Sequence, residues 1–194
     1  MRDEAGVVRD SDLWNSSPLR FRAAHAGDIP RLVELVESAY RGEASRAGWT
    51  TEADLLDGRR TDSDEIGAIL GRDRSRLLLA EGDGALLSCA HVAVEDDAGY
   101  FGMFSVDPGS QGKGLGKLVL AECERIATQE WHCPLMRMSV IDLRDELIAF
   151  YERRGYHRTG IKKPFPYGDE RFGLPKRDDL RFEILEKPLL ASRA

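Results

Sequence analysis

A glycine-rich segment between an expected strand and an expected helix constrains this chain more than any other feature. The segment runs from Gln111 to Lys117; it follows an apolar run at 99–106 and opens a stretch with one apolar helical face, from Gly114 to about Glu130. The first amides of a helix have no intrahelical partner, and the helix dipole adds positive charge there. Glycines allow several of these amides to converge on phosphate oxygens, and two lysines can add charge. The sequence therefore predicts a site for a phosphate or a pyrophosphate.

Two familiar phosphate-binding loops do not match this segment. The P-loop pattern G-x-x-x-x-G-K-[ST], started at Gly109, places Gly114 correctly but meets Leu115 where the lysine should be. The dinucleotide fingerprint G-x-G-x-x-G also fails, because Gly112, Gly114 and Gly116 are spaced G-x-G-x-G. A glycine-rich turn that merely closes a strand–helix junction remains the structural alternative.

The segment resembles a known cofactor signature. Gln111-x-x-Gly114-x-Gly116, placed after Val106-Asp107-Pro108, is similar to the acetyl-CoA motif Q/R-x-x-G-x-G/A of the GCN5-related N-acetyltransferase (GNAT) superfamily. A second match lies downstream, where Phe150-Tyr151-Glu152-Arg153-Arg154-Gly155-Tyr156 resembles the element L/F-Y-x-x-x-G-F/Y of the same superfamily. The resemblance covers roughly Leu19 to Lys187.

The resemblance implies a fold and a cofactor. It implies a single α/β domain with a mixed central sheet, in which two parallel strands, 99–106 and 135–141, splay apart around acetyl-CoA. The backbone of Phe104 and Val106 would bind the pantetheine arm, and the amides of 111–116 would bind the pyrophosphate. The expected cofactor-binding residues are Phe104, Val106, Gln111, Gly112, Lys113, Gly114, Leu115, Gly116 and Lys117.

Tyr151 matches the usual general acid of the superfamily. When an amine attacks a thioester directly, the leaving group is a thiolate, and a phenol with a pKa near 10 can protonate it at neutral pH. The alternative is a core tyrosine on a helix face, because Leu147 and Tyr151 are spaced i, i+4.

Two positions depart from the pattern of the superfamily. Arg144 stands seven residues before Tyr151, where an asparagine is common, and it is expected either to meet the cofactor or to face solvent. The stretch 100–103 has no carboxylate, although many members carry a glutamate there as the general base. We therefore expect an ordered water to relay the proton, and the possible proton acceptors are Glu52, His91 and Glu95.

Composition, apolar periodicity and turn signals divide the rest of the chain. Residues 1–18 are expected to form a tail or arm, and residues 19–194 the N-acetyltransferase domain. The expected elements in chain order are a strand at 19–23, a helix from about Asp28 to Tyr40, short helices near Thr51–Asp57 and Asp64–Gly71, strands at 76–80, 85–94 and 99–106, the helix at 114–130, a strand at 135–141, a short helix around 143–154, and strands at 156–159 and 180–186.

Transfer of an acetyl group from acetyl-CoA to a primary amine is the expected activity, with a small-molecule acceptor. Protein or peptide N-acetylation and a non-catalytic acyl-CoA-binding module are the alternatives. Trp49 and Glu52 are candidates for an amine-recognition wall, although the threonines between them are also suited to cap a helix. The aromatic stretch 164–175 is expected either to cover the acceptor site or to bury the interface of a homodimer.

Composition narrows the class of protein further. The net charge of −6 disfavours a dedicated nucleic-acid binder. Cys89, Cys123 and Cys133 share no metal-ligand spacing, so we expect buried reduced thiols and no metal. No apolar stretch follows the charged start Met1–Glu4, and no run approaches the roughly 18 apolar residues of a membrane span. We expect a soluble cytoplasmic protein with no membrane partner.

Overall fold

The computed structural model describes residues 19–41, 45–46 and 51–189, so the tail expected at 1–18 lies outside the described residues. The strands of the main sheet are β1 (Arg20–Ala23), β3 (Ser75–Gly82), β4 (Ala85–Glu95), β5 (Ala98–Val106), β6 (Leu135–Ile141), β7 (His157–Pro164) and β9 (Arg181–Pro188). Two short strands, β2 (Leu56–Asp57) and β8 (Leu174–Pro175), pair separately. The α-helices are α1 (Ile29–Tyr40), α3 (Ser63–Leu70), α4 (Leu115–Arg125) and α5 (Asp145–Glu152). The π-helix η4 (Ile126–Glu130) continues α4, and the 3-10 turns are η2 (Ala26–Asp28), η3 (Pro108–Ser110) and η5 (Glu170–Phe172).

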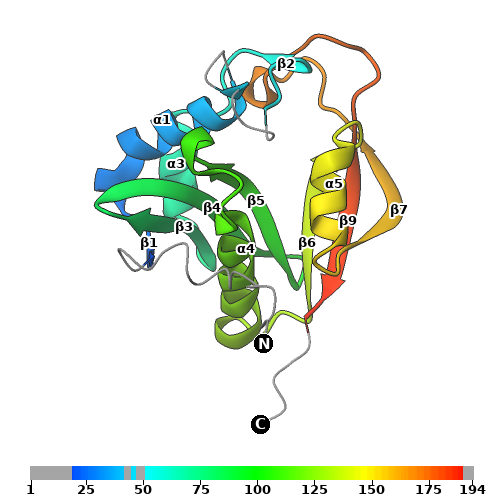
Figure 1. The fold of residues 1–194 in the computed structure, drawn as a ribbon. Helices are drawn as coiled ribbons and strands as arrows, with labels where there is room; N and C mark the ends of the chain where they lie inside the picture. Colours follow the sequence, from blue (N-terminus) through cyan, green and yellow to red (C-terminus); the bar gives the residue numbers. More distant parts are fainter. Residues whose placement is uncertain (1–18, 42–44, 47–50, 190–194) are drawn as a thin grey trace, which may run out of the picture.

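The main sheet is mixed, as the sequence predicts. Its strand order is β1-β3-β4-β5-β6-β9-β7, and β5 and β6 form the parallel pair at its centre (Figure 1). The helix α4 connects these two strands, which is the crossover that a parallel pair requires. The single α/β domain with a mixed sheet is therefore confirmed.

The parallel pair is joined only at its beginning. Its paired positions are Gly99 with Met136 and Tyr100 with Arg137. A Cβ atom on Gly99 would lie 2.9 Å from both the Ala127 Cβ and the Met136 Sδ, so the close approach there requires glycine. Beyond this point β5 and β6 diverge, and Figure 1 shows the opening widening towards the C-terminal ends of the two strands.

A β-bulge changes which residues of β5 face each side of the sheet. The register with β4 shifts between Cys89 and His91, and Met103 opposite adopts a left-handed φ of 44°. Because of the extra residue, Phe101 and Phe104 both pack in the core under α4, whereas Met103 packs with α1. After the bulge, Phe104 and Val106 at the open end of β5 therefore lie in the core that α4 covers.

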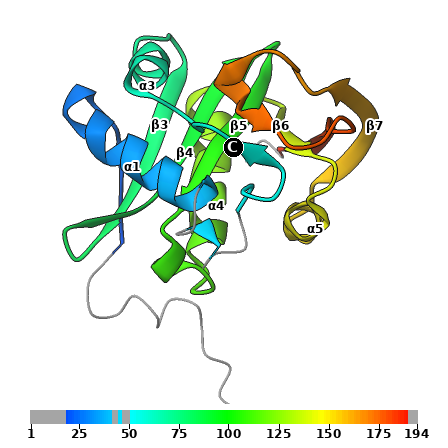
Figure 2. The same ribbon diagram turned by 90° about the horizontal axis from the view of Figure 1, so that it is seen from above.

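Helices cover both faces of the sheet (Figure 2). Leu77 and Leu79 of β3 pack with α1 and α3, whereas Leu78 and Ala80 pack with α4. Because both faces are covered, β3 reads as a continuous apolar run rather than an alternating one. The helix α5 contributes to the same core as α4, so these two helices flank the opening between β5 and β6.

The helix expected near Thr51–Asp57 is wrong. A single turn forms, in which the amides of Leu55 and Leu56 donate to the Glu52 carbonyl, and the chain then becomes β2. Pairing of β2 with β8, which comes from a distant part of the chain, overrides the local helical preference. Across the described ranges, no helix is both long and apolar enough to span a membrane.

Candidate active site

The glycine-rich segment forms an irregular turn that presents the start of α4. Gly112 and Gly114 adopt left-handed φ angles of 79° and 76°, which disfavour other L-residues. Gly114 is the N-cap of α4 and offers no side-chain oxygen, so no side chain caps the first amides of the helix. The Gln111 side-chain nitrogen Nε2 donates to the Val106 carbonyl at 3.1 Å and ties the turn to β5. The turn therefore leaves a helix N-terminus available to an anion.

A cavity of about 320 Å³ lies beside this turn, between β5, α4 and α5. Its lining residues are Phe104, Val106, Ser110, Gln111, Gly112, Gly114, Leu115, Gly116, Lys117, Phe150 and Arg154. Every expected cofactor-binding residue except the exposed Lys113 is in this lining. The lining contains Lys117 and Arg154 but no carboxylate. An uncapped helix start, two cations and apolar walls fit a ligand that combines a pyrophosphate with a thin arm, as acetyl-CoA does.

Phe150 and Arg154 belong to this cavity but were not expected from the sequence. The Arg154 guanidinium lies 3.5 Å from the centroid of the Phe150 ring and donates to the Phe150 carbonyl at 2.6 Å. Burial and the neighbouring Arg153 lower the pKa of Arg154. Both residues lie within the second sequence motif, so the positive charge of Arg154 beside the motif glycine, Gly155, was the signal that could have identified them.

Tyr151 is almost completely buried, with 4% of its surface exposed. Its ring packs edge-on against Phe101, Phe150 and Tyr156. Its hydroxyl makes no hydrogen bond within the described part of the chain. Burial raises the pKa of Tyr151 well above its usual value, so the phenol keeps its proton at neutral pH. The side chain is thus a packed core residue whose hydroxyl has no partner among the residues that the structure describes.

A second group of polar side chains lies close enough to act electrostatically on Tyr151, and Tyr40 is at its centre. The Tyr40 hydroxyl, at the end of α1, donates a short hydrogen bond to the carbonyl of Phe104. Arg60 and Arg144 lie over the Tyr40 ring, with guanidinium carbons 5.3 and 5.8 Å from its centroid. One tyrosine ring therefore connects the cofactor cavity to a cluster of arginines.

Glu52 is the buried carboxylate of this cluster. Arg41 donates to one oxygen at 2.7 Å, and Arg144 to the other at 3.0 Å. Burial alone would raise the pKa of Glu52, but the charges of Arg144, Arg60 and Arg41 outweigh it and hold the pKa below its usual value. Glu52 is therefore an ionised partner of arginines, and Trp49, its expected neighbour in an amine-recognition wall, lies outside the described residues.

The structure excludes one of the two expectations for Arg144. Its side chain is 9% exposed, so it does not face solvent. It is not among the residues that line the cavity beside α4, and its contact with the cofactor stays a prediction. Pairing with Glu52 across 92 residues of sequence accounts for its burial.

The candidate proton acceptors all have reduced basicity or a partner. Burial lowers the pKa of His91 to about 4, and Ser75 shares a hydrogen bond with its ring at 2.8 Å. Glu95 forms an ion pair with Arg72 at 3.2 Å beside the exposed turn at 96–97. With Glu52 held as an ion-pair partner, no one of the three stands out as a dedicated base.

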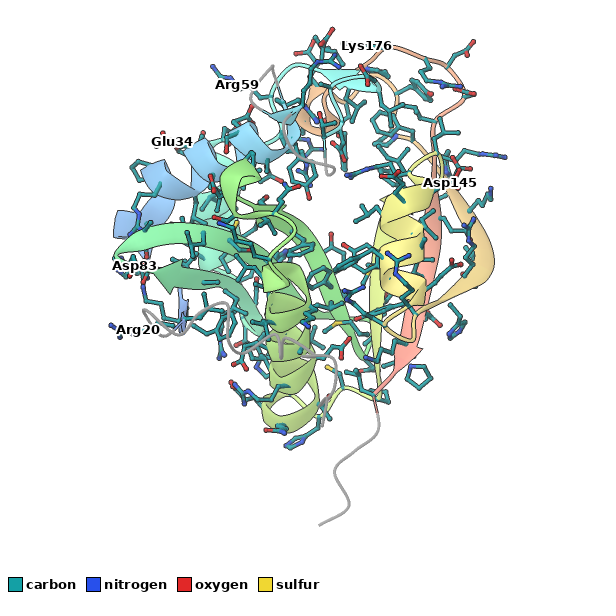
Figure 3. The ribbon with its side chains drawn as sticks, in the orientation of Figure 1. Arg20, Glu34, Arg59, Asp83, Asp145 and Lys176 are labelled. Carbon is teal, nitrogen blue, oxygen red and sulfur yellow. The ribbon has the colours of Figure 1, made fainter. Side chains whose placement is uncertain are left out.

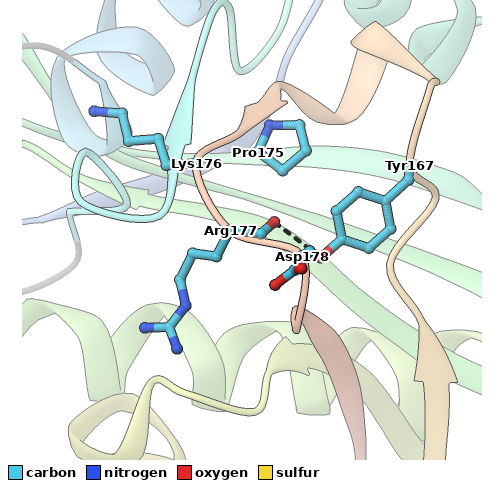
Figure 4. Close-up of a pocket in the computed structure, with 5 residues that line it drawn as sticks. All are labelled: Tyr167, Pro175, Lys176, Arg177 and Asp178. Atoms are coloured by element: carbon cyan, nitrogen blue, oxygen red, sulfur yellow. Dashed lines mark hydrogen bonds between the residues drawn. The ribbon is translucent and has the colours of Figure 1, made fainter.

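A larger depression of about 460 Å³ lies in the loop before β9 and is lined by Tyr167, Pro175, Lys176, Arg177 and Asp178 (Figure 4). The Tyr167 hydroxyl donates to the Arg177 carbonyl at 3.1 Å across it. It contains no residue of either motif and is shallow, so the smaller cavity beside α4 is the better candidate for the cofactor.

Comparison with protein families assigns the class of protein. A model of the acetyltransferase (GNAT) family matches residues 30–156, about two thirds of the chain. The chain belongs to this family of acetyl-CoA-dependent N-acetyltransferases. The resemblance, the enzyme class and the transferase activity expected from the sequence are therefore confirmed, and the alternative of a non-catalytic module is set aside.

Solved structures support the same fold. The ribosomal-protein-S18-alanine N-acetyltransferase of Escherichia coli has 15% identity and a TM-score of 0.66, covering 91% of this chain and 97% of its own. A ribosomal-protein-alanine N-acetyltransferase from Brucella melitensis has 21% identity and a TM-score of 0.64, covering 88% and 99%. A spermidine N-acetyltransferase SpeG chimera from Vibrio cholerae and hSSAT has 15% identity and a TM-score of 0.64, covering 88% and 95%. A search of curated proteins gives no match. Since the named acceptors differ, the acceptor of this chain must be inferred from its own site.

Proposed function

We propose that this enzyme acetylates the primary amine of a small molecule and that the Tyr151 hydroxyl is the proton donor in this reaction. The observation that carries the proposal is a buried, protonated phenol that makes no hydrogen bond to any described residue, close to both the cofactor cavity and a second polar cluster. A proton donor beside an apolar arm-binding cavity is suited to acetyl transfer, because the departing sulfur needs a proton.

Different residues of the cavity would bind different parts of acetyl-CoA. The amides at the start of α4, together with Lys117 and Arg154, would hold the pyrophosphate, and Phe104 and Val106 would flank the pantetheine arm. When bound, acetyl-CoA supplies the acetyl group as a thioester. As the acceptor nitrogen bonds to the carbonyl carbon and the carbon–sulfur bond breaks, Tyr151 gives its proton to the sulfur. The amine proton passes to water, and Tyr151 is reprotonated from solvent.

Burial on the acceptor side supports a small acceptor over a folded protein. Tyr40 and Glu52 are 7% and 8% exposed, and Arg41 is covered by the loop at Gly173, where a Cβ atom would lie 3.0 Å from an Arg41 nitrogen. A free small amine can enter such a covered site whole, whereas the side chain or terminus of a folded protein must reach into it from a bulky body.

The test is acetyl transfer to an amine panel. Thiol release is followed with acetyl-CoA and each amine, and the acetylated product is identified by mass. Acetylated small amines are expected, with no release in the absence of an acceptor. Transfer to peptide or protein amines alone would contradict the proposal.

A further inference from the structure

The polar cluster beside Tyr151 contains several arginines around one buried glutamate, with the carboxylates of Glu37 and Glu65 at its edge. Three guanidinium groups, from Arg41, Arg60 and Arg144, surround the single buried carboxylate of Glu52. Arg41 and Arg144 occupy both oxygens of that carboxylate. Neither oxygen of Glu52 accepts a hydrogen bond from Arg60, the third guanidinium.

Arg60 carries the one guanidinium of these three that is not hydrogen-bonded to Glu52. Its side chain makes no hydrogen bond or ion pair with any residue that the structure describes, and its only ring contact is with Tyr40, at 5.3 Å. Burial alone would lower the pKa of Arg60, but Glu52, Tyr40 and Glu65 raise it, so the group stays charged. Glu65 is exposed, and its carboxylate instead accepts the hydroxyl of Thr61 at 2.7 Å.

The backbone around Arg60 is fixed. One oxygen of Glu37, on α1, accepts the amides of Arg60 and Thr61 at 2.5 and 2.9 Å. The arginine is thus presented from an anchored segment, and among the described residues its guanidinium has no hydrogen-bond acceptor. Its donors are open to solvent rather than buried, so an anion can reach them and form charge-assisted hydrogen bonds.

The position of Arg60 relative to the cofactor cavity sets the size of the ligand. Tyr40 reaches the Phe104 carbonyl with its hydroxyl, and Arg60 lies over its ring. The side chain of Tyr40 therefore links Arg60 to the wall of the cofactor cavity. A small ligand with its amine and its anion a few bonds apart suits two sites that one side chain links.

We infer that the acceptor is a small amine that also carries a carboxylate, and that Arg60 binds this carboxylate. The inference rests on the proposed function, and it names the substrate class. The planar guanidinium matches a carboxylate with two parallel hydrogen bonds, whereas a polycationic amine would meet the like charge of Arg60.

The test compares acids with their uncharged analogues. The wild-type enzyme is assayed with α-, β- and ω-amino acids, with the carboxamide of each, and with spermidine; thiol release gives kcat/KM. The best amino acid is expected to exceed its carboxamide by about 10-fold or more, because a hydrogen-bonded charge pair is lost in the amide.

Arg60→Gln and the matched control Arg59→Gln locate the effect. Arg59 is the exposed neighbour, labelled in Figure 3, and its substitution removes the same charge one residue away. Arg60→Gln should lower kcat/KM for the acid by about 10-fold or more, with little change for the carboxamide or in KM for acetyl-CoA, whereas Arg59→Gln should retain the preference. The preference of the wild type for acids requires no variant, so it tests the inference even if Arg60→Gln is unstable.

Three results would overturn the inference. Wild-type enzyme that acetylates carboxamides or spermidine as well as the acids would disprove the substrate class, while leaving the proposed function in place. An equal loss for acid and carboxamide in Arg60→Gln would show that Arg60 does not bind the carboxylate. Thiol release with none of these amines would overturn the inference, and the broader amine panel would then decide separately whether the proposed function stands.

Discussion

Replacement of Gly114 by aspartate should separate cofactor binding from folding. Gly114 lines the cavity and adopts a φ of 76°, and Gly84 adopts a φ of 75° in the exposed β3–β4 hairpin. A non-glycine residue in this left-handed region costs about 1 to 2 kcal/mol. Both Gly114→Asp and Gly84→Asp should therefore lower Tm, by about 2 to 8 °C for a chain of this size.

The two variants should differ only when acetyl-CoA is added. At about 100 times its Kd, a ligand that binds only the folded state adds about 2.7 kcal/mol, which raises Tm by about 5 to 11 °C. The carboxylate of Gly114→Asp would stand against the pyrophosphate and should abolish this rise, whereas Gly84→Asp should keep it. Thermal melts with and without acetyl-CoA measure both quantities. A folded Gly114→Asp protein with an undiminished rise would refute the placement of the cofactor at the start of α4.

Three further predictions follow from the charges of the site. Arg154→Gln should raise KM for acetyl-CoA by about 10-fold or more with little change in kcat, whereas Arg153→Gln, at the exposed neighbour, should change neither. Steady-state kinetics in which the two variants behave alike would contradict a role for Arg154 in binding acetyl-CoA. With a water relay, kcat/KM should rise with pH towards the pKa of the acceptor amine in wild type, His91→Gln and Glu95→Gln, and a loss above about 10³-fold in either variant would identify a dedicated base. Burial lowers the pKa of His91 from 6.5 to about 4, so as the pH falls the unfolded state binds the proton before the folded state does. About 3 kcal/mol of the free energy of unfolding that is present above pH 6.5 should therefore be lost by pH 4. Urea unfolding of His91→Gln should show a correspondingly smaller loss.

Local patterns were sufficient to predict the elements that carry the cofactor cavity. The strand 135–141 begins and ends where the apolar run does, and the helix after Gly114 follows its apolar face. The glycine turn also has a local cause, since Gly112 and Gly114 both need positive φ angles. These features depend on residues close together in the chain, so periodicity and turn chemistry reveal them.

The acceptor side could not be predicted in the same way. The hydrogen bond from Tyr40 to Phe104 joins residues 64 apart, and the ion pair of Arg144 with Glu52 joins residues 92 apart. In the sequence, Arg60 is one charged residue in a polar loop, and only packing against Tyr40 gives it a distinct environment. The failed helix near 51–57 has the same origin, because its last two residues pair with a strand more than a hundred residues away.

The central claim is that Tyr151 supplies a proton at the meeting point of cofactor and acceptor. Its most direct test is kcat of Tyr151→Phe with a good acceptor, measured beside the Tm rise that acetyl-CoA produces. The substitution keeps the ring packing against Phe101 and Tyr156 and removes only the hydroxyl. We predict that kcat falls by about 10²-fold or more while the Tm rise is unchanged. A kcat close to that of the wild type would contradict the claim and leave Tyr151 as a core residue.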